Sequence, residues 1–393
     1  MSGPLSGLKI LDFSTLLPGP YATQLLADMG AEVLRIESPT RPDLLRFAPP
    51  MVGEISAGHG SINRNKQCIA LDLKQPESTA IVKKLLQEYD IVLEQFRPGV
   101  MQRLGLDYQT LSAEKPELIY CSITGYGQTG PLKDRAGHDI NYLALAGLAS
   151  YSGRKDSGPI LSGTQIADIA GGTHHAVMGI LAAVIERHGS GKGQHIDISM
   201  SDAALALSTT AGAGHLAGDK APELSGTMLN GGIFYDYYET SDGRHISVGS
   251  LEPQFCKQLC EALGKADWFE RAMNYNPDVQ AELKQDLIVA FRQKSFAEWS
   301  EIFAALDACV EPVLDLGETE QHPHFQERGM YIEVQAADGQ TLRQVASPIK
   351  FSGSQTEYRN AGLPIGANTE EVLQQLGYDS AAIAALRDAG AIA

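Results

Sequence analysis

The chain has 393 residues, a formal net charge of −17, 43% hydrophobic residues and 20% charged residues. This length is too great for one compact core of ordinary size, so we expect two domains or one large domain with an insertion. The acidic balance argues against a nucleic-acid partner, which would call for a basic surface. No run of eighteen apolar residues and no secretory signal pattern occurs, so we expect a cytoplasmic protein without a membrane partner.

The five cysteines are an odd number, which favours a reducing compartment over a disulfide framework. Cys256 and Cys260 lie one helical turn apart, but no second pair and no neighbouring histidine completes a zinc site. The sequence therefore predicts no metal.

The first third of the chain alternates strand patterns with helix patterns. Strands are expected at 8–13, 32–36, 69–73, 91–94 and 118–123, and helices at 21–29, 76–89 and 100–104. This alternation predicts an α/β fold with a doubly wound parallel sheet, whose ligands would bind beyond the carboxyl ends of the strands. The Gly-x-Gly-x-x-Gly fingerprint is missing after the first strand, so the sheet would be Rossmann-like without a dinucleotide.

The pattern changes after the sheet. Helices are expected at 139–150, 168–188 and 199–216, then a hairpin over 234–248, then helices at 253–263, 278–293 and 296–306. We therefore expect a large α/β domain over 1–224, which would bind the ligand, a smaller α+β domain over 225–330, and a C-terminal segment, 331–393, that returns to the large domain.

Charge is unevenly distributed along the chain. Residues 1–105 contain as many basic as acidic side chains, so the whole negative excess lies downstream. The N-terminal third is therefore the better place for an anionic ligand.

Several ionisable residues stand where helices are expected to begin. His138 and Asp139 precede one helix, Asp168 a second, and Glu252 a third. From the residues alone, each has an ordinary explanation, because acidic residues cap helices and a histidine there can cap or pack. If His138 and Asp168 meet in space, however, they form a two-base site, in which one base removes a proton from a carbon and the other returns one.

Five longer motifs extend this pattern. They are GHDINYLALAG at 137–147, ADIAGG at 167–172, ERHGSGKGQHIDISMSD at 186–202, LNGGIFYDYYETSDGR at 229–244 and LEPQF at 251–255. Together they resemble the α-methylacyl-CoA racemases of the family III CoA-transferase superfamily, and the similarity extends from Leu8 to at least 307–318 and on through 322–329. The resemblance implies that family's fold, a large Rossmann-like domain with a smaller α+β domain, and an interlocked homodimer.

The resemblance also implies a reaction. His138 and Asp168 would be the two catalytic bases, Glu252 would orient His138, and Asp139 would be a helix cap or an acceptor behind the bases. The substrate would be a 2-methylacyl-CoA thioester, whose (R) and (S) forms interconvert through an enolate that the protein must stabilise. We expect backbone N–H groups at the start of the Asp168 helix to supply that stabilisation.

Coenzyme A would enter as part of the substrate, and no separate cofactor would be required. The positions that match the family's CoA site are Arg35, Leu71, Leu73, Lys74, Arg97, Arg103 and Tyr142. The cations would hold phosphates, the two leucines would flank the adenine, and the tyrosine would lie near the pantetheine or thioester. Arg64 and Lys66 are weaker candidates for the phosphates, and Met200 and Met228 are candidates for an adaptable acyl pocket.

Two other functions remain open. CoA transferases of the same superfamily use the residue matching Asp168 as a nucleophile that forms an anhydride and then a CoA thioester. Formyl-CoA-type transferases carry Gln where this chain has Leu17, and consecutive glycines where it has only 230–232, whereas a carnitine-type transferase is harder to exclude. A catalytically silent CoA-binding protein would be expected to lack His138, Asp168 or Glu252, and all three are present.

Overall fold

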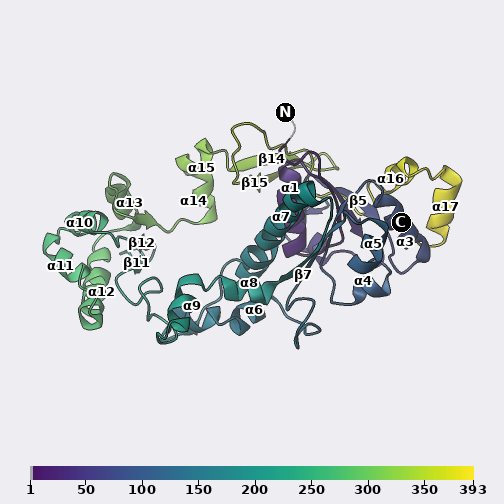
Figure 1. The fold of residues 1–393 in the computed structure, drawn as a ribbon. Helices are drawn as coiled ribbons and strands as arrows, with labels where there is room; N and C mark the ends of the chain where they lie inside the picture. The colour runs from purple at the N-terminus through teal and green to yellow at the C-terminus, as the bar shows by residue number, and fades with distance from the viewer. Residues whose placement is uncertain (1–2) are drawn as a thin grey trace. The chain divides into compact units, whose positions relative to one another are not determined.

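The structure is a computed structural model that describes residues 3–393 (Figure 1). It divides into two compact units. The larger unit comprises the described part of Met1–Ala146 together with Thr164–Leu207 and Pro323–Ala393, and the smaller unit comprises Gly147–Gly163 and Ser208–His322. The sequence had placed the boundaries at 224 and 330, so the smaller unit begins earlier than expected and takes in an additional loop from the first half of the chain.

A six-stranded parallel sheet forms the centre of the larger unit, in the order β10-β7-β6-β1-β2-β5. Its strands are β1 (Lys9–Asp12), β2 (Glu32–Glu37), β5 (Gln67–Ala70), β6 (Ile91–Glu94), β7 (Ile119–Thr124) and β10 (His195–Ser199). The first five overlap the predicted strands, although β5 ends at Ala70, three residues before the predicted end. The sixth, β10, was not predicted, because this edge strand alternates polar and apolar residues and lacks the continuous apolar run of a buried parallel strand.

The sheet has a switch point between β1 and β6. From β1 the chain adds β2 and β5 on one side, and later β6, β7 and β10 on the other. The loops that leave β1 and β6 therefore diverge, and open α/β sheets bind ligands at such a place. The loops concerned are residues 13–17 and 95–99.

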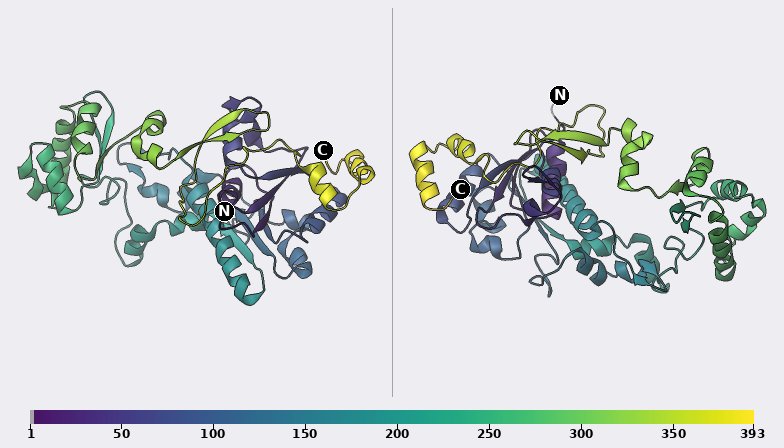
Figure 2. Two further views of the ribbon diagram at one scale, coloured as in Figure 1. Left: turned by 90° about the horizontal axis from the view of Figure 1, so that it is seen from above. Right: turned by 180° about the vertical axis from the view of Figure 1, so that it is seen from behind.

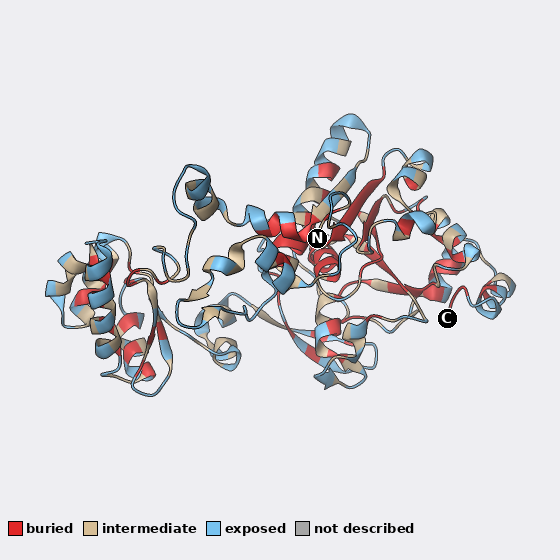
Figure 3. Ribbon diagram, turned by 90° about the horizontal axis from the view of Figure 1, so that it is seen from below, coloured by how far each residue is buried: buried red, intermediate tan, exposed pale blue. Residues whose placement is uncertain are grey.

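Helices cover both faces of this sheet. Helices α1 (Pro18–Asp28) and α7 (His174–Ser190) lie on one face, and α3 (Pro76–Leu85) and α5 (Tyr108–Glu114) lie on the other (Figures 1 and 2). Apart from β10 at the edge, the strands between these layers are buried, as Figure 3 shows. The other elements of this unit are η1 (Leu44–Phe47), β3 (Met51–Val52), β4 (Ile55–Ser56), α2 (Ala57–Ile62), α4 (Val100–Arg103), α6 (Asp139–Leu145), η3 (Ala167–Thr173), α8 (Met200–Ala206), α15 (Pro323–Glu327), β14 (Tyr331–Gln335), β15 (Thr341–Val345), α16 (Thr369–Gln375) and α17 (Ser380–Asp388).

The C-terminal segment packs against the α3 side of the sheet. Val372, Ile383 and Ile392 are buried in one core with Ile81 of α3, and Figure 2 shows α16 and α17 beside that helix. Leu71, just beyond β5, pairs with Ile392 in an antiparallel bridge. The last stretch of sequence thus completes the core that the first stretch begins.

One helical segment among the described residues, Ala167–Ser190, is long and apolar enough to cross a membrane by length and composition, with a mean hydropathy of 1.3. The same segment lies directly on the sheet, since a Cβ atom added at Gly179 would meet Ile196 of β10 at 3.0 Å. Such packing is typical of a core helix in an α/β domain.

The smaller unit is built on a three-stranded antiparallel sheet, in the order β11-β12-β13. Its core contains stacked rings of Tyr238, Phe291, Trp299 and Phe303. Its elements are η2 (Leu148–Tyr151), β8 (Gly153–Arg154), β9 (Gly158–Pro159), α9 (Thr209–Leu216), β11 (Asp236–Glu239), β12 (His245–Val248), α10 (Pro253–Ala262), η4 (Ala266–Trp268), α11 (Phe269–Ala272), α12 (Pro277–Phe291), α13 (Phe296–Ala304), β13 (Val310–Pro312) and α14 (Leu316–Gln321). The predicted hairpin and the three predicted helices are confirmed, whereas the helix expected over 199–216 is broken into α8 and α9.

Candidate active site

A cavity of about 460 Å³ opens at the switch point of the large sheet. We call it the catalytic cavity. It is lined by Leu16, Pro18, Gln95, Phe96, Arg97, Pro98, Ile123, Thr124, Gly125, Lys133, Arg135, Ala136, Gly137, His138, Asn141, Tyr142, Asp168 and Met200. Five residues that the sequence singled out therefore line one cavity: His138, Asp168, Tyr142, Arg97 and Met200.

His138 is placed by the start of helix α6. It is the N-cap residue, and its backbone N–H donates to Oδ1 of Asn141 at 3.0 Å. The N–H of Asn141 donates back to the carbonyl of His138 at 2.8 Å. These two bonds close the first turn and leave the imidazole, which is exposed, free to face a ligand.

Asp139 links the two helix starts. Its Oδ1 accepts the N–H of Ala167 at 2.6 Å and the N–H of Asp168 at 3.1 Å. Asp139 therefore holds Asp168 close to His138. The same contact occupies the N–H groups that we expected to stabilise an enolate, so that expectation is wrong for these two amides.

The carboxyl of Asp168 has a perturbed proton affinity. Burial, and then the charge of Asp139, raise the pKa of Asp168 to about 6, while His138 acts in the opposite direction. A carboxyl with this pKa populates both protonation states close to neutral pH. It can therefore accept a proton in one direction of a reaction and donate one in the other.

Small residues let the Asp168 segment pack closely on the start of α1. Asp168 lies in the π-helix η3, which continues into α7. A Cβ atom added at Gly172 would meet Pro18 at 3.0 Å, and the hydroxyl of Thr173 donates to the carbonyl of Pro18 at 2.7 Å. The widened turn of a π-helix is a frequent feature of functional sites, and here it fixes Asp168 in the cavity wall.

Tyr142 supports the loop before His138. A Cβ atom added at Gly125 would meet its ring at 2.6 Å, and one added at Gly137 would meet it at 2.7 Å, so only glycine fits on either side. The hydroxyl donates to the carbonyl of Gly137 at 2.5 Å. Burial, followed by the charge of Asp168, raises the pKa of Tyr142 to about 12. The hydroxyl group therefore stays protonated and donates its hydrogen bond to the backbone.

The residues assigned to CoA separate into exposed and buried groups. Arg97, Arg103 and Lys74 are exposed, and Leu73 is half-buried at the edge of the core. Leu71, in contrast, is completely buried. Because it has no accessible surface, it cannot flank an adenine, and we remove it from the CoA contacts.

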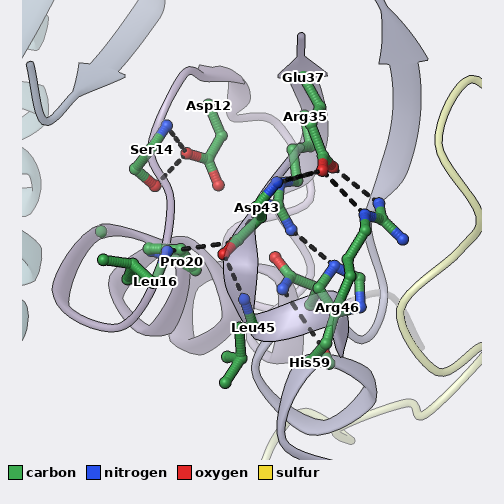
Figure 4. Close-up of polar contacts among 12 residues, drawn as sticks. Asp12, Ser14, Leu16, Pro20, Arg35, Glu37, Asp43, Leu45, Arg46 and His59 are labelled. Carbon is green, nitrogen blue, oxygen red and sulfur yellow. Dashed lines mark hydrogen bonds and ion pairs between the residues drawn. The ribbon is translucent and has the colours of Figure 1, made fainter. Parts of the chain in front are cut away.

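Arg35 is also unavailable to a ligand, because it is buried in a polar network (Figure 4). Its guanidinium donates to Oδ2 of Asp43 at 2.6 Å and lies 2.9 Å from Nε2 of His59. Burial and the charge of Arg46 lower the pKa of His59 to about 2, so its neutral ring can accept this bond. Asp43 in turn accepts the N–H of Leu16 at 3.1 Å. Arg35 thus supports the cavity loop from behind, and we do not retain it as a phosphate ligand.

The two weaker phosphate candidates are buried as well. Arg64 pairs with Asp28 at 2.6 Å, and Lys66 pairs with Asp12 at 3.2 Å. The even charge balance of residues 1–105 therefore reflects internal ion pairs in addition to exposed cations.

Sequence reasoning missed several residues of the cavity wall. Lys133 and Arg135 are exposed cations, and Gln95 accepts the N–H of Gly19 at 3.0 Å. The available signal was their position in the loops that follow β7 and β6. With Arg97, the two cations are the groups that could hold an anionic ligand in this cavity. Among residues 3–393, no group of three or more His, Cys, Asp or Glu side chains is placed to hold a metal ion.

Glu252 belongs to the smaller unit, where it is the N-cap residue of α10. Its side chain is exposed and makes no capping hydrogen bond to that helix. The side chain of Glu252 therefore does not cap the helix, and its carboxylate is available for another partner.

The chain is similar to known proteins over nearly its whole length. The sequence profile of CoA-transferase family III matches residues 5–369. The chain is 36% identical over 377 residues to the alpha-methylacyl-CoA racemase of Homo sapiens, covering 95% of this chain and 94% of that protein. It is 34% identical over 385 residues to a succinate–glutarate CoA-transferase of Agrobacterium fabrum, covering 95% and 96%. A CaiB/BaiF family protein from Brucella suis matches it with a TM-score of 0.83 at 30% identity, covering 96% of this chain and all of that one.

Proposed function

This chain is an enzyme of CoA-transferase family III, and we propose that it interconverts (R)- and (S)-2-methylacyl-CoA thioesters by two-base proton transfer. The observation that carries the proposal is the presence of His138 and Asp168 in one cavity. A CoA transferase needs the carboxylate as its nucleophile, whereas a second base beside it is what a 1,1-proton transfer requires.

The proposed reaction moves one proton between the two bases. Neutral His138 takes the α-proton, protonated Asp168 returns a proton to the opposite side of the carbon, and the pair is left as imidazolium and carboxylate. The reverse direction starts from that second state. The pKa of Asp168, about 6, supports the proposal because it makes both states accessible near neutral pH.

We assign binding of the thioester to groups of the larger unit. Arg97, Arg103 and Lys74 would hold the phosphates, Leu73 would contact the adenine, and Met200 would contact the acyl chain. Tyr142 would act by shaping the wall near the thioester. Glu252 is proposed to orient the imidazole of His138. No further cofactor enters this scheme.

A CoA transferase is the second candidate function, and the 34% identity to the Agrobacterium transferase favours it. In that reaction Asp168 would attack the thioester carbonyl and release CoA as a thiolate, leaving an acyl anhydride. The thiolate would then form a thioester with Asp168, releasing the first acid, and the acceptor acid would leave with CoA.

One experiment separates the two functions. A single enantiomer of a 2-methylacyl-CoA is incubated with the protein in D₂O without an acceptor acid, and deuterium at the α-carbon is measured by mass spectrometry. Racemisation predicts label and loss of optical purity. No label, together with transfer of CoA to added succinate or glutarate, would establish the transferase and exclude the racemase.

A variant tests whether deuterium exchange depends on the proposed base His138. His138→Ala should reduce exchange by at least about a hundredfold, since a positioned acid–base group contributes on that scale, while the Kd for CoA stays nearly unchanged. His188→Ala is the matched control, because this exposed histidine on α7 lies outside the cavity. Full activity of His138→Ala would remove that residue from the mechanism.

A further inference from the structure

Glu94 is a buried acidic residue that the proposed reaction does not use. It ends β6 and is 4% exposed. The four residues that follow it, 95–98, all line the catalytic cavity. Strand β6 therefore places an acidic side chain directly behind one wall of that cavity.

Two hydrogen bonds hold this carboxyl group. Its Oε2 accepts the N–H of Phe96 at 2.7 Å, and Ser122, the register partner of Glu94 on β7, donates to it as well. The hydroxyl oxygen of Ser122 lies 2.9 Å from Nε2 of His195 on β10. A chain of polar side chains thus crosses three adjacent strands and ends at the turn that carries Phe96.

Segment 95–98 is fixed at a second point by the first turn of α1. The side-chain oxygen of Gln95 accepts the N–H of Gly19 at 3.0 Å. A Cβ atom added at Gly19 would meet the same oxygen at 2.8 Å, so this turn packs directly on the segment. The shape of this wall therefore depends on Gly19 and on Glu94.

The segment separates two cavities. A second one of about 230 Å³, which we call the rear cavity, is lined by Glu94, Arg97, Pro98, Gly99, Met101, Gln102, Asp107, Tyr108, Gln109, Tyr120, Ser122, Gln128 and His195. Arg97 and Pro98 line both cavities. Residues 95–98 thus form a partition between the two cavities: Phe96 packs against the core of the larger unit, whereas Arg97 and Pro98 have open space on both sides. The bond from Glu94 to the N–H of Phe96 fixes the backbone next to Arg97.

We propose that Glu94 is a positioning residue for the acyl-CoA, because by holding the N–H of Phe96 it keeps the partition where Arg97 can contact the CoA moiety. The proposal rests on the proposed function in so far as the catalytic cavity binds an acyl-CoA. Glu94 itself contacts no substrate in this scheme and acts only through the partition.

The strength of this anchor depends on ionisation. Burial raises the pKa of Glu94 to about 7, and the charge of Asp197 on β10 acts in the same direction. Arg97 and Asp107 are the other charged residues lining the rear cavity, and burial lowers the pKa of His195, so that ring is neutral. An ionised carboxylate accepts stronger hydrogen bonds than a neutral carboxyl group. CoA affinity is therefore expected to rise as the pH rises through about 7.

The test is calorimetric titration of the full chain with free CoA between pH 6 and pH 8. Glu94→Ala removes the acceptor and should weaken binding about tenfold at pH 8, as expected when a hydrogen bond to a charged group is lost. Glu94→Gln keeps an acceptor but has no charge, so its loss should be smaller, and its Kd should change less across pH 7 than that of the wild-type chain, because Asp168 still titrates in the same cavity. Asp107→Asn is the matched control, since Asp107 lines the same cavity but bonds to Thr110.

A second measurement distinguishes a loss of substrate positioning from partial misfolding of the variant. In the exchange assay, the Glu94 variants should raise KM and leave kcat unchanged, whereas a merely misfolded fraction would lower kcat at constant KM. If Glu94→Ala does not fold, the pH dependence of the Kd of Glu94→Gln for CoA tests the proposal. Unchanged CoA affinity in both variants would overturn the role. Tighter binding by Glu94→Gln at pH 8 would also overturn it, by showing that the charge repels the CoA phosphates. A wild-type chain that binds no CoA would instead refute the proposed function.

Discussion

The pairing of Asp139 with the Asp168 segment is the decisive contact at the scale of single residues. One carboxylate accepts two backbone N–H groups, at Ala167 and Asp168, and at the same time places a negative charge beside a second carboxyl. The contact therefore sets both the position and the proton affinity of Asp168. The sequence could suggest that Asp139 is a cap or an acceptor, but it could not identify the partner, because the two segments lie far apart along the chain.

Asp139→Asn is expected to move the pH profile of the reaction. Asparagine keeps an acceptor oxygen for the backbone but removes the charge that raises the pKa of Asp168. The folded-state pKa of Asp168 should then fall below about 6, so the acidic limb of kcat/KM should shift to lower pH. Initial rates of deuterium exchange from pH 4.5 to pH 8 measure this. An acidic limb that stays in place would show that Asp139 does not tune Asp168.

At the scale of secondary-structure elements, the loop after β1 depends on a buried ion-pair network. Asp43 accepts bonds from Arg35, from the N–H of Leu16 and from the N–H of Leu45. Leu16 has a backbone φ of +61°, a left-handed conformation that is costly for leucine. The network therefore holds a strained loop at the rim of the catalytic cavity.

Asp43→Ala should destabilise the larger unit by about 3 kcal/mol, because it leaves the buried Arg35 without its shortest ion pair. Both tryptophans, Trp268 and Trp299, belong to the smaller unit, so their fluorescence would not report this loss. Hydrogen exchange in peptides from β1 and β2 is the appropriate measurement. Asp43→Asn is the milder control, since it keeps the acceptor for Leu16. Unchanged protection in the alanine variant would count against the network's role.

The elements show which features a sequence can predict. The five predicted strands are rich in apolar residues, and the helix starts at His138 and Asp168 carry clear polar signals, so local pattern was sufficient for both. Arg35 and Leu71 failed as CoA contacts because burial is decided by tertiary partners, namely Asp43 and the distant Ile392. Strand β10 was missed because an edge strand exposes one side and loses the signature of a buried parallel strand.

At the scale of the whole molecule, charge is divided between interior and surface in a way that composition does not show. Four basic residues of the N-terminal third, Arg35, Arg46, Arg64 and Lys66, are consumed by internal ion pairs. Their partners are Asp43, Glu37, Asp28 and Asp12 of the same third, so these pairs leave the net charge of −17 unchanged but remove four cations from the surface. An acidic substrate must then rely on a few exposed cations near the catalytic cavity, such as Arg97, and its binding should weaken with added salt.

Helix α7 points to self-association, the homodimer that the sequence resemblance implies. Its outer side exposes Met178 and Ile185, which are 55% and 73% accessible. Exposed apolar side chains on a helix that is otherwise part of a core suit a covered surface. We expect the 42.2 kDa chain to elute with the mass of a dimer in light-scattering chromatography. Ile185→Glu should shift the population towards monomer, and Glu186→Gln, at the adjacent exposed position, should not. A wild-type monomer at micromolar concentration would contradict the proposal.

The two units are formed from different parts of the chain, and this has a consequence for folding during synthesis on the ribosome. The core of the larger unit needs Val372, Ile383 and Ile392 from the stretch 323–393, so it cannot close until those residues have been translated and have left the exit tunnel. The smaller unit has all of its residues by position 322. The nascent chain can therefore fold the smaller unit first, while the strands that were made earlier still lack part of their core. Chaperones are then expected to bind the exposed N-terminal strands.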